Sequence, residues 1–189
     1  MGKVMLAMYV TLDGFISGPN GELDWLPESE DTSRDNIEIL SNAKGILLGR
    51  ETYSVFEAYW PAAVTSPSTY PADIPLAHLL NDLTKYVFSS TLSAVSWKNT
   101  NLVKDRAEDV VPKLKRESGG DLVIFGGAAL AQSLMRVGLI DEYRLSVAPL
   151  ALGKGKPLFQ GIDHRSNFKL VETKTMDPGF VGLRYRPLS

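Results

Sequence analysis

A pair of glycines, Gly126 and Gly127, stands between an apolar run at residues 121–125 and a helical pattern at residues 127–137. Because glycine has no side chain, a pyrophosphate can approach the backbone there, and the N-terminus of a helix offers unpaired amide hydrogens and partial positive charge. The same pair also suits a tight strand-to-helix turn that holds no ligand. The pair alone therefore leaves both a phosphate site and a simple turn open.

Two further polar groups follow apolar runs. Gly49, Arg50 and Thr52 open a second helical pattern, where the arginine could pair with a phosphate through two hydrogen bonds. A capped helix with a solvated arginine is the alternative, and Ser89 and Ser90, after a third run, alone suit a polar turn. If the three groups line one sheet edge, they predict a dinucleotide site, with arginine and hydroxyls favouring the 2′-phosphate of NADP.

Carboxylates are the candidate proton donors for a reduction. Asp13 follows the first apolar run and could protonate a C=N or C=O acceptor, directly or through water. Asp-Gly is also strong turn chemistry, so Asp13 could instead bind the backbone amides around Gly14. Glu30, Asp31 and Asp35 are weaker candidates, because acidic residues near a helix start also complement the helix dipole.

Other side chains could contact a substrate. Trp25 could stack on a planar heterocycle or belong to the core. Lys154 and Lys156 could bind a ribose phosphate or lie in a solvated glycine-rich loop. His78 and His164 are interpreted as ordinary, partly exposed residues, so no metal site is predicted.

The composition fits one globular domain over residues 1–189. A net charge of −2 argues against nucleic acid, and no apolar run is long enough to cross a membrane. The absence of cysteine excludes thiolate nucleophiles and disulfides and fits a reducing compartment. The N-terminal run is too short for a signal peptide, so we expect a cytoplasmic protein with a small-molecule substrate.

The elements that must position these residues alternate between strand and helix patterns. Continuous apolar runs predict strands covered on both faces at residues 3–10, 45–49, 85–89 and 121–125. Helical spacing is found at residues 30–42, 51–58, 73–82, 108–117 and 127–137. Pro112 fits its helix only if that helix starts near residues 108–111. Residues 141–149, 167–175 and 180–186 predict further strands. The Pro- and Ser-rich stretch 61–75 predicts a surface loop, whose length makes it a candidate lid or rim of the site.

This order predicts an α/β fold: a three-layer α/β/α sandwich whose mostly parallel central sheet carries antiparallel C-terminal strands. A Gly-x-Gly-x-x-Gly fingerprint is absent after the first strand, so a dinucleotide site would not be of the Rossmann kind.

Seven segments resemble the dihydrofolate reductase-like superfamily, in the branch of the C-terminal reductase domain of the bifunctional riboflavin-biosynthesis deaminase/reductase. They are Thr-Leu-Asp-Gly-Phe-Ile-Ser-Gly at 11–18, Leu-Asp-Trp at 23–25, Leu-Gly-Arg-Glu-Thr-Tyr at 48–53, Lys-Tyr-Val-Phe-Ser at 85–89, Val-Ile-Phe-Gly-Gly-Ala at 123–128, Leu-Ile-Asp-Glu at 139–142 and Leu-Gly-Lys-Gly-Lys-Pro-Leu-Phe at 152–159.

The resemblance implies the same sandwich fold and NADPH as cofactor. It implies that the cofactor is held by Tyr9, Ile16, Gly18, Gly49, Arg50, Thr52, Ser89, Ser90, Phe125, Gly126, Gly127, Ala128 and Ala129. The loop at residues 16–23 would cover the nicotinamide. Candidate substrate contacts are Trp25, Glu30, Asp31 and Lys154, and Asp13 is the candidate catalytic residue.

The implied function is NADPH-dependent reduction of a small heterocycle, first of the 5-amino-6-(5-phosphoribosylamino)uracil type. Dihydrofolate reduction is the alternative within the enzyme class, although no acidic residue after Trp25 stands at a position that spacing forces. A non-catalytic NADP-binding or interaction module of the same fold is the alternative outside it. Relatives of the riboflavin type pair as dimers, so we expect a homodimer formed through apolar residues of 141–175, such as Val147, Ala148, Leu150 and Leu152.

Overall fold

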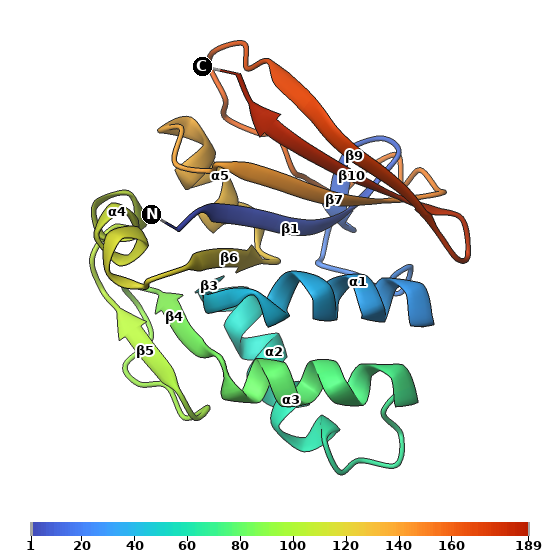
Figure 1. The fold of residues 1–189 in the computed structure, drawn as a ribbon, viewed down its shortest axis with the longest axis horizontal. Coiled ribbons are helices and arrows are strands. Elements are labelled where there is room, and N and C mark those ends of the chain that lie inside the picture. The colour runs from blue at the N-terminus through green and yellow to red at the C-terminus, as the bar shows by residue number, and fades with distance from the viewer. Residues whose placement is uncertain (1, 189) are drawn as a thin grey trace.

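Eight strands form one sheet in the computed structural model, which describes residues 2–188 (Figure 1). Their order across the sheet is β5 (Thr100–Val103), β4 (Thr84–Phe88), β3 (Ala43–Gly49), β6 (Asp121–Phe125), β1 (Val4–Thr11), β7 (Glu142–Ala148), β10 (Phe180–Pro187) and β9 (Phe168–Met176). The strands from β5 to β7 run parallel, whereas β10 is antiparallel to both β7 and β9. The predicted mixed sheet is confirmed.

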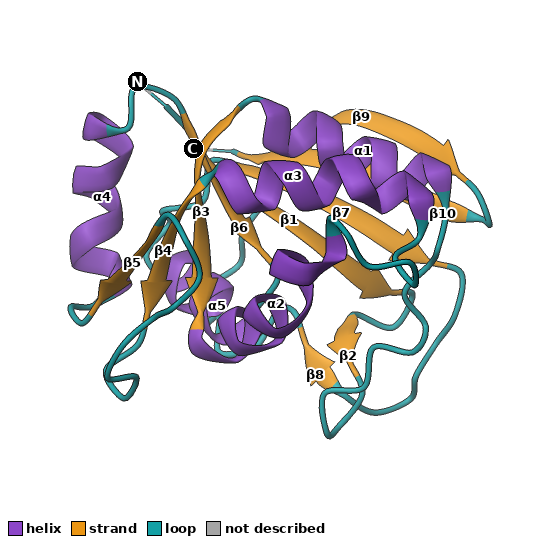
Figure 2. Cartoon of the chain, turned by 90° about the horizontal axis from the view of Figure 1, so that it is seen from below, coloured by secondary structure: helices purple, strands orange, loops and turns teal. Residues whose placement is uncertain are grey.

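Helices cover both faces of this sheet. Three helices lie on one face: α1 (Glu30–Ser41), α2 (Arg50–Ala63) and α3 (Ile74–Asp82). The other face carries α4 (Ala107–Glu117) and α5 (Ala128–Arg136). Figure 2 shows α1 and α3 side by side across the sheet. The short strands β2 (Phe15–Ser17) and β8 (Lys156–Pro157) pair separately, and a 3₁₀ turn, η1 (Pro71–Asp73), leads into α3.

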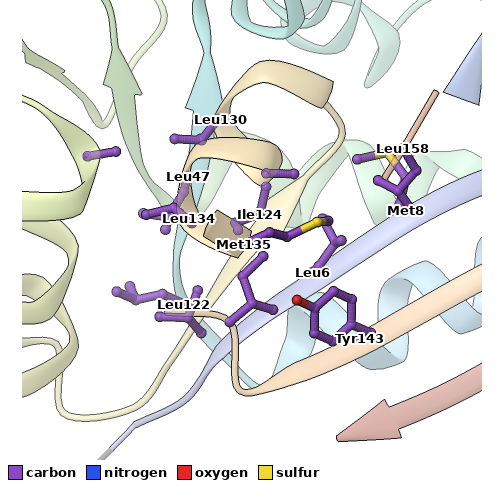
Figure 3. Packing of buried hydrophobic residues seen from close by; sticks show 14 of the residues in the cluster. Leu6, Met8, Leu47, Leu122, Ile124, Leu130, Leu134, Met135, Tyr143 and Leu158 are labelled. Atoms are coloured by element: carbon purple, nitrogen blue, oxygen red, sulfur yellow. The ribbon is translucent and has the colours of Figure 1, made fainter. Parts of the chain in front are cut away.

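The central strand β1 is buried on both faces because its residues alternate between two cores. Leu6 and Met8 point into the cluster beneath α4 and α5, which Figure 3 shows with Leu134 and Tyr143. Met5 and Ala7 belong to the opposite cluster, beneath α1 and α3. The uninterrupted apolar run is therefore what a doubly covered strand requires. Truncating one of these buried leucines to alanine costs about 2–5 kcal/mol of stability.

Several predicted boundaries were wrong. The short edge strand β5 was missed, because its four residues have one neighbouring strand and contain no continuous apolar run. The stretch 61–75 is only in part a loop, since α2 continues through Pro61 to Ala63 and η1 begins at Pro71. Helix α4 begins at Ala107, so that Pro112 lies in its second turn rather than its first.

The apolar surface expected for a dimer also differs. Ala148 is fully buried, and Val147, Leu150 and Leu152 are half-buried. Val147 packs against the cluster beneath α4 and α5, and Leu150 packs against the cluster of Ala148, Met176 and Phe180. Exposed apolar side chains lie instead on β9 and β10. Within residues 2–188, no helix is long and apolar enough to cross a membrane.

Candidate functional site

A large cleft opens where the parallel strands end, at their carboxyl edge. Its volume is about 1540 Å³, above the range of roughly 300–1,000 Å³ for a pocket that holds one drug-sized ligand. The cleft therefore has room for a dinucleotide and a second small molecule. Its lining contains all the residues expected to hold the cofactor except Gly18: Tyr9, Ile16, Gly49, Arg50, Thr52, Ser89, Ser90, Phe125, Gly126, Gly127, Ala128 and Ala129.

Two helix N-termini meet at one end of this cleft. Helix α2 begins after Gly49 on β3 and helix α5 begins after Gly127 beyond β6, and β3 and β6 are neighbours in the sheet (Figure 2). Neither N-cap residue makes a side-chain hydrogen bond to its helix. The amide hydrogens of both first turns therefore stay available, and both helix dipoles favour an anion between them.

Gly126 and Gly127 let the two turns approach each other. Both residues have positive φ, +79° and +85°, which other residues rarely adopt. A Cβ added to Gly127 would lie 2.8 Å from the Thr52 Oγ1 atom of the neighbouring turn. A side chain there would fill the cradle that the backbones leave, so the two glycines suit a phosphate that contacts main-chain amides.

Cationic and hydroxyl groups surround the same end. Arg50 lies on the first turn of α2, Ser89 and Ser90 follow β4, and Arg106 precedes α4. Arg50 is 3.8 Å from Glu51, but this pair is exposed and stabilises the protein by at most about 1 kcal/mol, so a phosphate can readily replace it. Sequence reasoning missed Arg106 because it missed β5, the strand that leads to this arginine.

A different set of polar groups lines the part of the cleft between β1 and α1. The Tyr9 hydroxyl accepts a hydrogen bond of 3.0 Å from the Asn36 amide. Ser33, also on α1, lies 2.5 Å from a carboxylate oxygen of Asp73, which ends η1. Thr32 completes this group. These residues were not predicted, because their proximity depends on how α1 packs against η1 and α3 rather than on a local motif.

Burial shifts the acidities in this polar region. Burial raises the pKa of the Asp73 carboxyl, and the negative charge of Glu28 raises it further, while the hydrogen bond with Ser33 lowers it in part. Burial also raises the pKa of the Tyr9 phenol, against the lowering effect of its hydrogen bonds with Asn36 and Thr32. The shared cause of both shifts, burial, shows that this part of the cleft is shielded from water.

Asp13, the predicted proton donor, is absent from the lining of this cleft. Its carboxylate accepts hydrogen bonds from the Thr11 hydroxyl at 2.5 Å and from the amides of Gly153 and Leu152 at 2.7 and 3.2 Å. These bonds, that of Thr11 foremost, lower the pKa of Asp13. The carboxylate therefore joins the turn after β1 to the loop at residues 152–153, rather than to the amides around Gly14 as the turn alternative expected.

The expected substrate residues also lie outside the cleft lining. Trp25 packs against the buried cluster of Ala148, Met176 and Phe180, which makes it a core-type residue. Asp31, in the first turn of α1, contacts Arg34 at 3.1 Å instead of the cleft.

Three further predicted residues are absent from the lining. Glu30 is exposed at the start of α1, and Lys154 is exposed in its glycine-rich loop. The amide of Gly18 donates to the Glu22 carbonyl within a local turn, so this glycine shapes the loop rather than the cleft. Lys156 does line the cleft and lies 3.3 Å from Glu51.

The donor set fits a dinucleotide rather than a metal ion. No group of three His, Asp or Glu side chains that could hold a metal ion occurs in the part of the chain that the structure describes. Two open helix N-termini, two arginines and several hydroxyls are the groups that bind phosphates. Residues from β1, α1 and η1 line another part of the same cleft.

Comparison with solved structures shows which fold this is. A putative riboflavin biosynthesis protein from Shewanella sp. PV-4 superposes with a TM-score of 0.77 over 99% of both chains, at 21% identity. Dihydrofolate reductase from Enterococcus faecalis, solved with NADP(H), superposes with a TM-score of 0.65 over 100% of this chain and 98% of that one, at 14% identity. The fold is dihydrofolate reductase-like.

Sequence comparison identifies the family. The protein named "Uncharacterized protein YyaP" from Bacillus subtilis (strain 168) is 37% identical over 97% of this chain and 94% of its own length. The model of the RibD C-terminal domain matches residues 2–182. The resemblance that the sequence motifs indicated is confirmed, and the chain belongs to the RibD C-terminal domain family.

Proposed function

We propose that this protein is an NADPH-dependent reductase of a small heterocyclic substrate, most like 5-amino-6-(5-phosphoribosylamino)uracil reductase. The observation that carries the proposal is the pair of uncapped helix N-termini, of α2 and α5, that face one cleft beside Arg50 and Arg106. Family membership in the RibD C-terminal domain family supports a reductase of the riboflavin pathway.

The residues divide into two tasks. The backbone at Gly49 and at Gly126–Gly127 binds the pyrophosphate, while Arg50, Ser89 and Ser90 bind the 2′-phosphate that distinguishes NADPH from NADH. When bound, the dihydronicotinamide supplies a hydride to a C=N or C=O carbon of the substrate. The remaining task of the chain is to orient the acceptor and to supply one proton to the adjacent nitrogen or oxygen.

Lys156 favours a phosphorylated substrate. Its ammonium group lines the cleft, where the exposed Glu51 is its partner at 3.3 Å. A partner that is itself exposed is readily exchanged for a phosphate. The ribose phosphate of the aminouracil substrate would supply such a group, whereas the glutamyl tail of dihydrofolate would bring carboxylates.

The cofactor assignment is tested by titrating the protein with NADPH and with NADH, following tryptophan fluorescence, since Trp60 lines the cleft. We expect NADPH to bind much more tightly than NADH. Arg50→Ala should remove most of that preference, about tenfold to a hundredfold in affinity, because it deletes a charge-assisted hydrogen bond to phosphate.

Arg34→Ala is the matched control, because Arg34 is exposed on α1 and pairs with Asp31 away from the cleft. It should leave both affinities unchanged. If neither nucleotide binds at millimolar concentration, the reductase proposal fails, and an interaction module of the same fold takes its place.

A further inference from the structure

Asp73 stands where an aspartate usually caps a helix, but its side chain does not cap α3. Asp73 is the N-cap residue of α3, yet its carboxylate makes no hydrogen bond to the amides of that helix. Its Oδ1 atom instead lies 2.5 Å from the hydroxyl of Ser33 on α1, at the wall of the cleft. The carboxyl group therefore connects two elements that are 40 residues apart in sequence and faces the volume between them.

The hydrogen bonds around Ser33 show that it donates to Asp73. The carbonyl of Ser29 already accepts the Ser33 amide at 3.0 Å and the Thr32 hydroxyl at 3.0 Å. Although the Ser33 hydroxyl is also 2.9 Å from this carbonyl, it has one proton, and the Asp73 oxygen is the nearer acceptor. One oxygen of Asp73 is thus satisfied, and within residues 2–188 the other has no hydrogen-bond partner.

The charge around Asp73 is negative, whereas the end of the cleft where α2 and α5 begin carries the positive charges of Arg50 and Arg106. Within the described residues Asp73 forms no ion pair, and the charge of Glu28, which raises the pKa of Asp73, is also negative. Tyr9, which faces the same volume, feels the charge of Asp73 as well. A substrate group that carries negative charge would be repelled here, whereas a group that donates N–H hydrogen bonds would be attracted.

We propose that Asp73 contacts the substrate and selects a nitrogen heterocycle that presents N–H donors to the free carboxylate oxygen. The inference rests on the reductase function proposed above, because that function places a heterocycle in the cleft beside the cofactor. Asp73 then fixes the orientation of the ring. A phosphate group on the substrate would bind Lys156 rather than lie beside the negative charges of Asp73 and Glu28.

The test measures binding of two planar probes of similar size by calorimetry, with the protein saturated with NADP⁺. The first probe, 2,4,6-triaminopyrimidine, is rich in N–H donors, and the second, orotate, carries a carboxylate. We expect the triaminopyrimidine to bind at least tenfold more tightly than orotate. Asp73→Asn should weaken the triaminopyrimidine at least tenfold, since the amide places N–H groups where the carboxylate accepted them.

Glu30→Gln removes the same charge from an exposed site at the start of α1, and it should change both probe affinities less than twofold. Ser33→Ala keeps the carboxylate but deletes its hydrogen bond, so we expect a smaller loss than in Asp73→Asn. The affinity for NADPH should stay within twofold in all three variants, which shows that each variant is folded.

The outcomes separate the two proposals. If wild-type protein binds NADPH but Asp73→Asn binds the triaminopyrimidine as wild type does, the role of Asp73 is refuted and the cofactor assignment stands. Failure of the wild type to prefer the triaminopyrimidine over orotate also refutes it. If wild-type protein fails to bind NADPH, the reductase function itself falls. Should Asp73→Asn lose NADPH affinity as well, Ser33→Ala decides, and an unchanged probe affinity in that variant counts against the proposal.

Discussion

Two effects make a side chain at Gly127 destabilising, backbone strain and a contact with Thr52. A pair of glycine-to-alanine variants measures them separately. Its φ of +85° strains any residue with a Cβ, and that Cβ would also lie 2.8 Å from Thr52 Oγ1. Gly119 has a φ of +68° but no atom within 4 Å of an added Cβ. We therefore expect Gly119→Ala to lose about 1–2 kcal/mol from backbone strain alone, and Gly127→Ala to lose more.

Urea unfolding measures both losses, and an NADPH titration measures the binding effect. Gly127→Ala should weaken NADPH binding because its methyl group occupies the cradle between α2 and α5, while Gly119→Ala should bind normally. Equal stability losses in the two variants, with unchanged NADPH binding, would show that the contact with Thr52 is relieved and that the cradle is not the cofactor site.

The residues at the end of the cleft where α2 and α5 begin could be predicted from the sequence. Those in the part of the cleft between β1 and α1 could not. Gly49, Arg50 and the glycine pair follow strands directly, so each carries a local signal that parallel sheets bring to one edge. Asp73 lies 40 residues from Ser33, and their contact depends on the packing of α1 against η1. For Asp13 a local signal was misleading. The Asp-Gly pair is typical of a turn, and its carboxyl group was also interpreted as a proton donor, but the carboxylate binds Thr11 and the loop at residues 152–153.

At the scale of elements, the buried carboxylate of Glu142 forms ion pairs between β7, the last of the parallel strands, and the antiparallel strand β10. Glu142 on β7 is fully buried and contacts Arg184 and Arg186 of β10 at 2.8 and 3.1 Å. Burial alone would raise its pKa, but the hydrogen bonds from Arg184 and Arg186 and the nearby positive charges lower it to about 2.

Glu142→Gln should therefore cost up to about 3 kcal/mol at pH 7, because it removes the buried negative charge that Arg184 and Arg186, both only partly buried, stabilise. The pKa in the folded state is below that of an unfolded glutamate, so the stabilisation is complete above about pH 4.5. It is lost as the pH falls toward 2, by about 3 kcal/mol in all.

Urea titrations at pH 7, 4 and 3 check both points. The Glu142→Gln protein should show less acid dependence than wild type over this interval. Glu172→Gln is the control, since Glu172 is an exposed partner of the same Arg184 at 3.4 Å and should change stability by less than about 1 kcal/mol. Equal acid dependence in wild type and Glu142→Gln would contradict the low pKa.

Elements with strong internal patterns were predicted well, and elements fixed by their neighbours were not. β1 and β6 are apolar throughout because both of their faces are covered, which a single sequence shows directly. β5 pairs only with β4, and its four residues carry no such pattern. The last turn of α2 passes through Pro61, although a proline is a local signal for a helix to stop.

At the scale of the molecule, we predict a homodimer whose interface is the outer part of the sheet. Leu170 on β9 is 48% exposed and Val181 on β10 is 39% exposed. Tyr185 lies opposite Leu170 in the pairing of these strands, so an apolar strip covers this edge. Burying such side chains between two copies would remove apolar surface from water.

Sedimentation velocity tests this prediction against the chain mass of 20.7 kDa. Wild-type protein should sediment as two chains, and the double variant Leu170→Asp, Val181→Asp as one. Leu12→Asp, which places the same charge on an exposed leucine outside β9 and β10, should leave the dimer intact. A wild-type protein that sediments as a single chain refutes the predicted dimer.

The position of β1 sets the order in which this chain can be completed during translation. β1 leaves the ribosome before both of its sheet neighbours, β6, which begins at Asp121, and β7, which begins at Glu142. All residues between β1 and β6 must be synthesised before the apolar run of β1 gains either neighbour. A nascent chain that has not reached residue 121 therefore exposes the apolar strand β1, which a chaperone could bind, and we expect folding to be slow for a domain of this size.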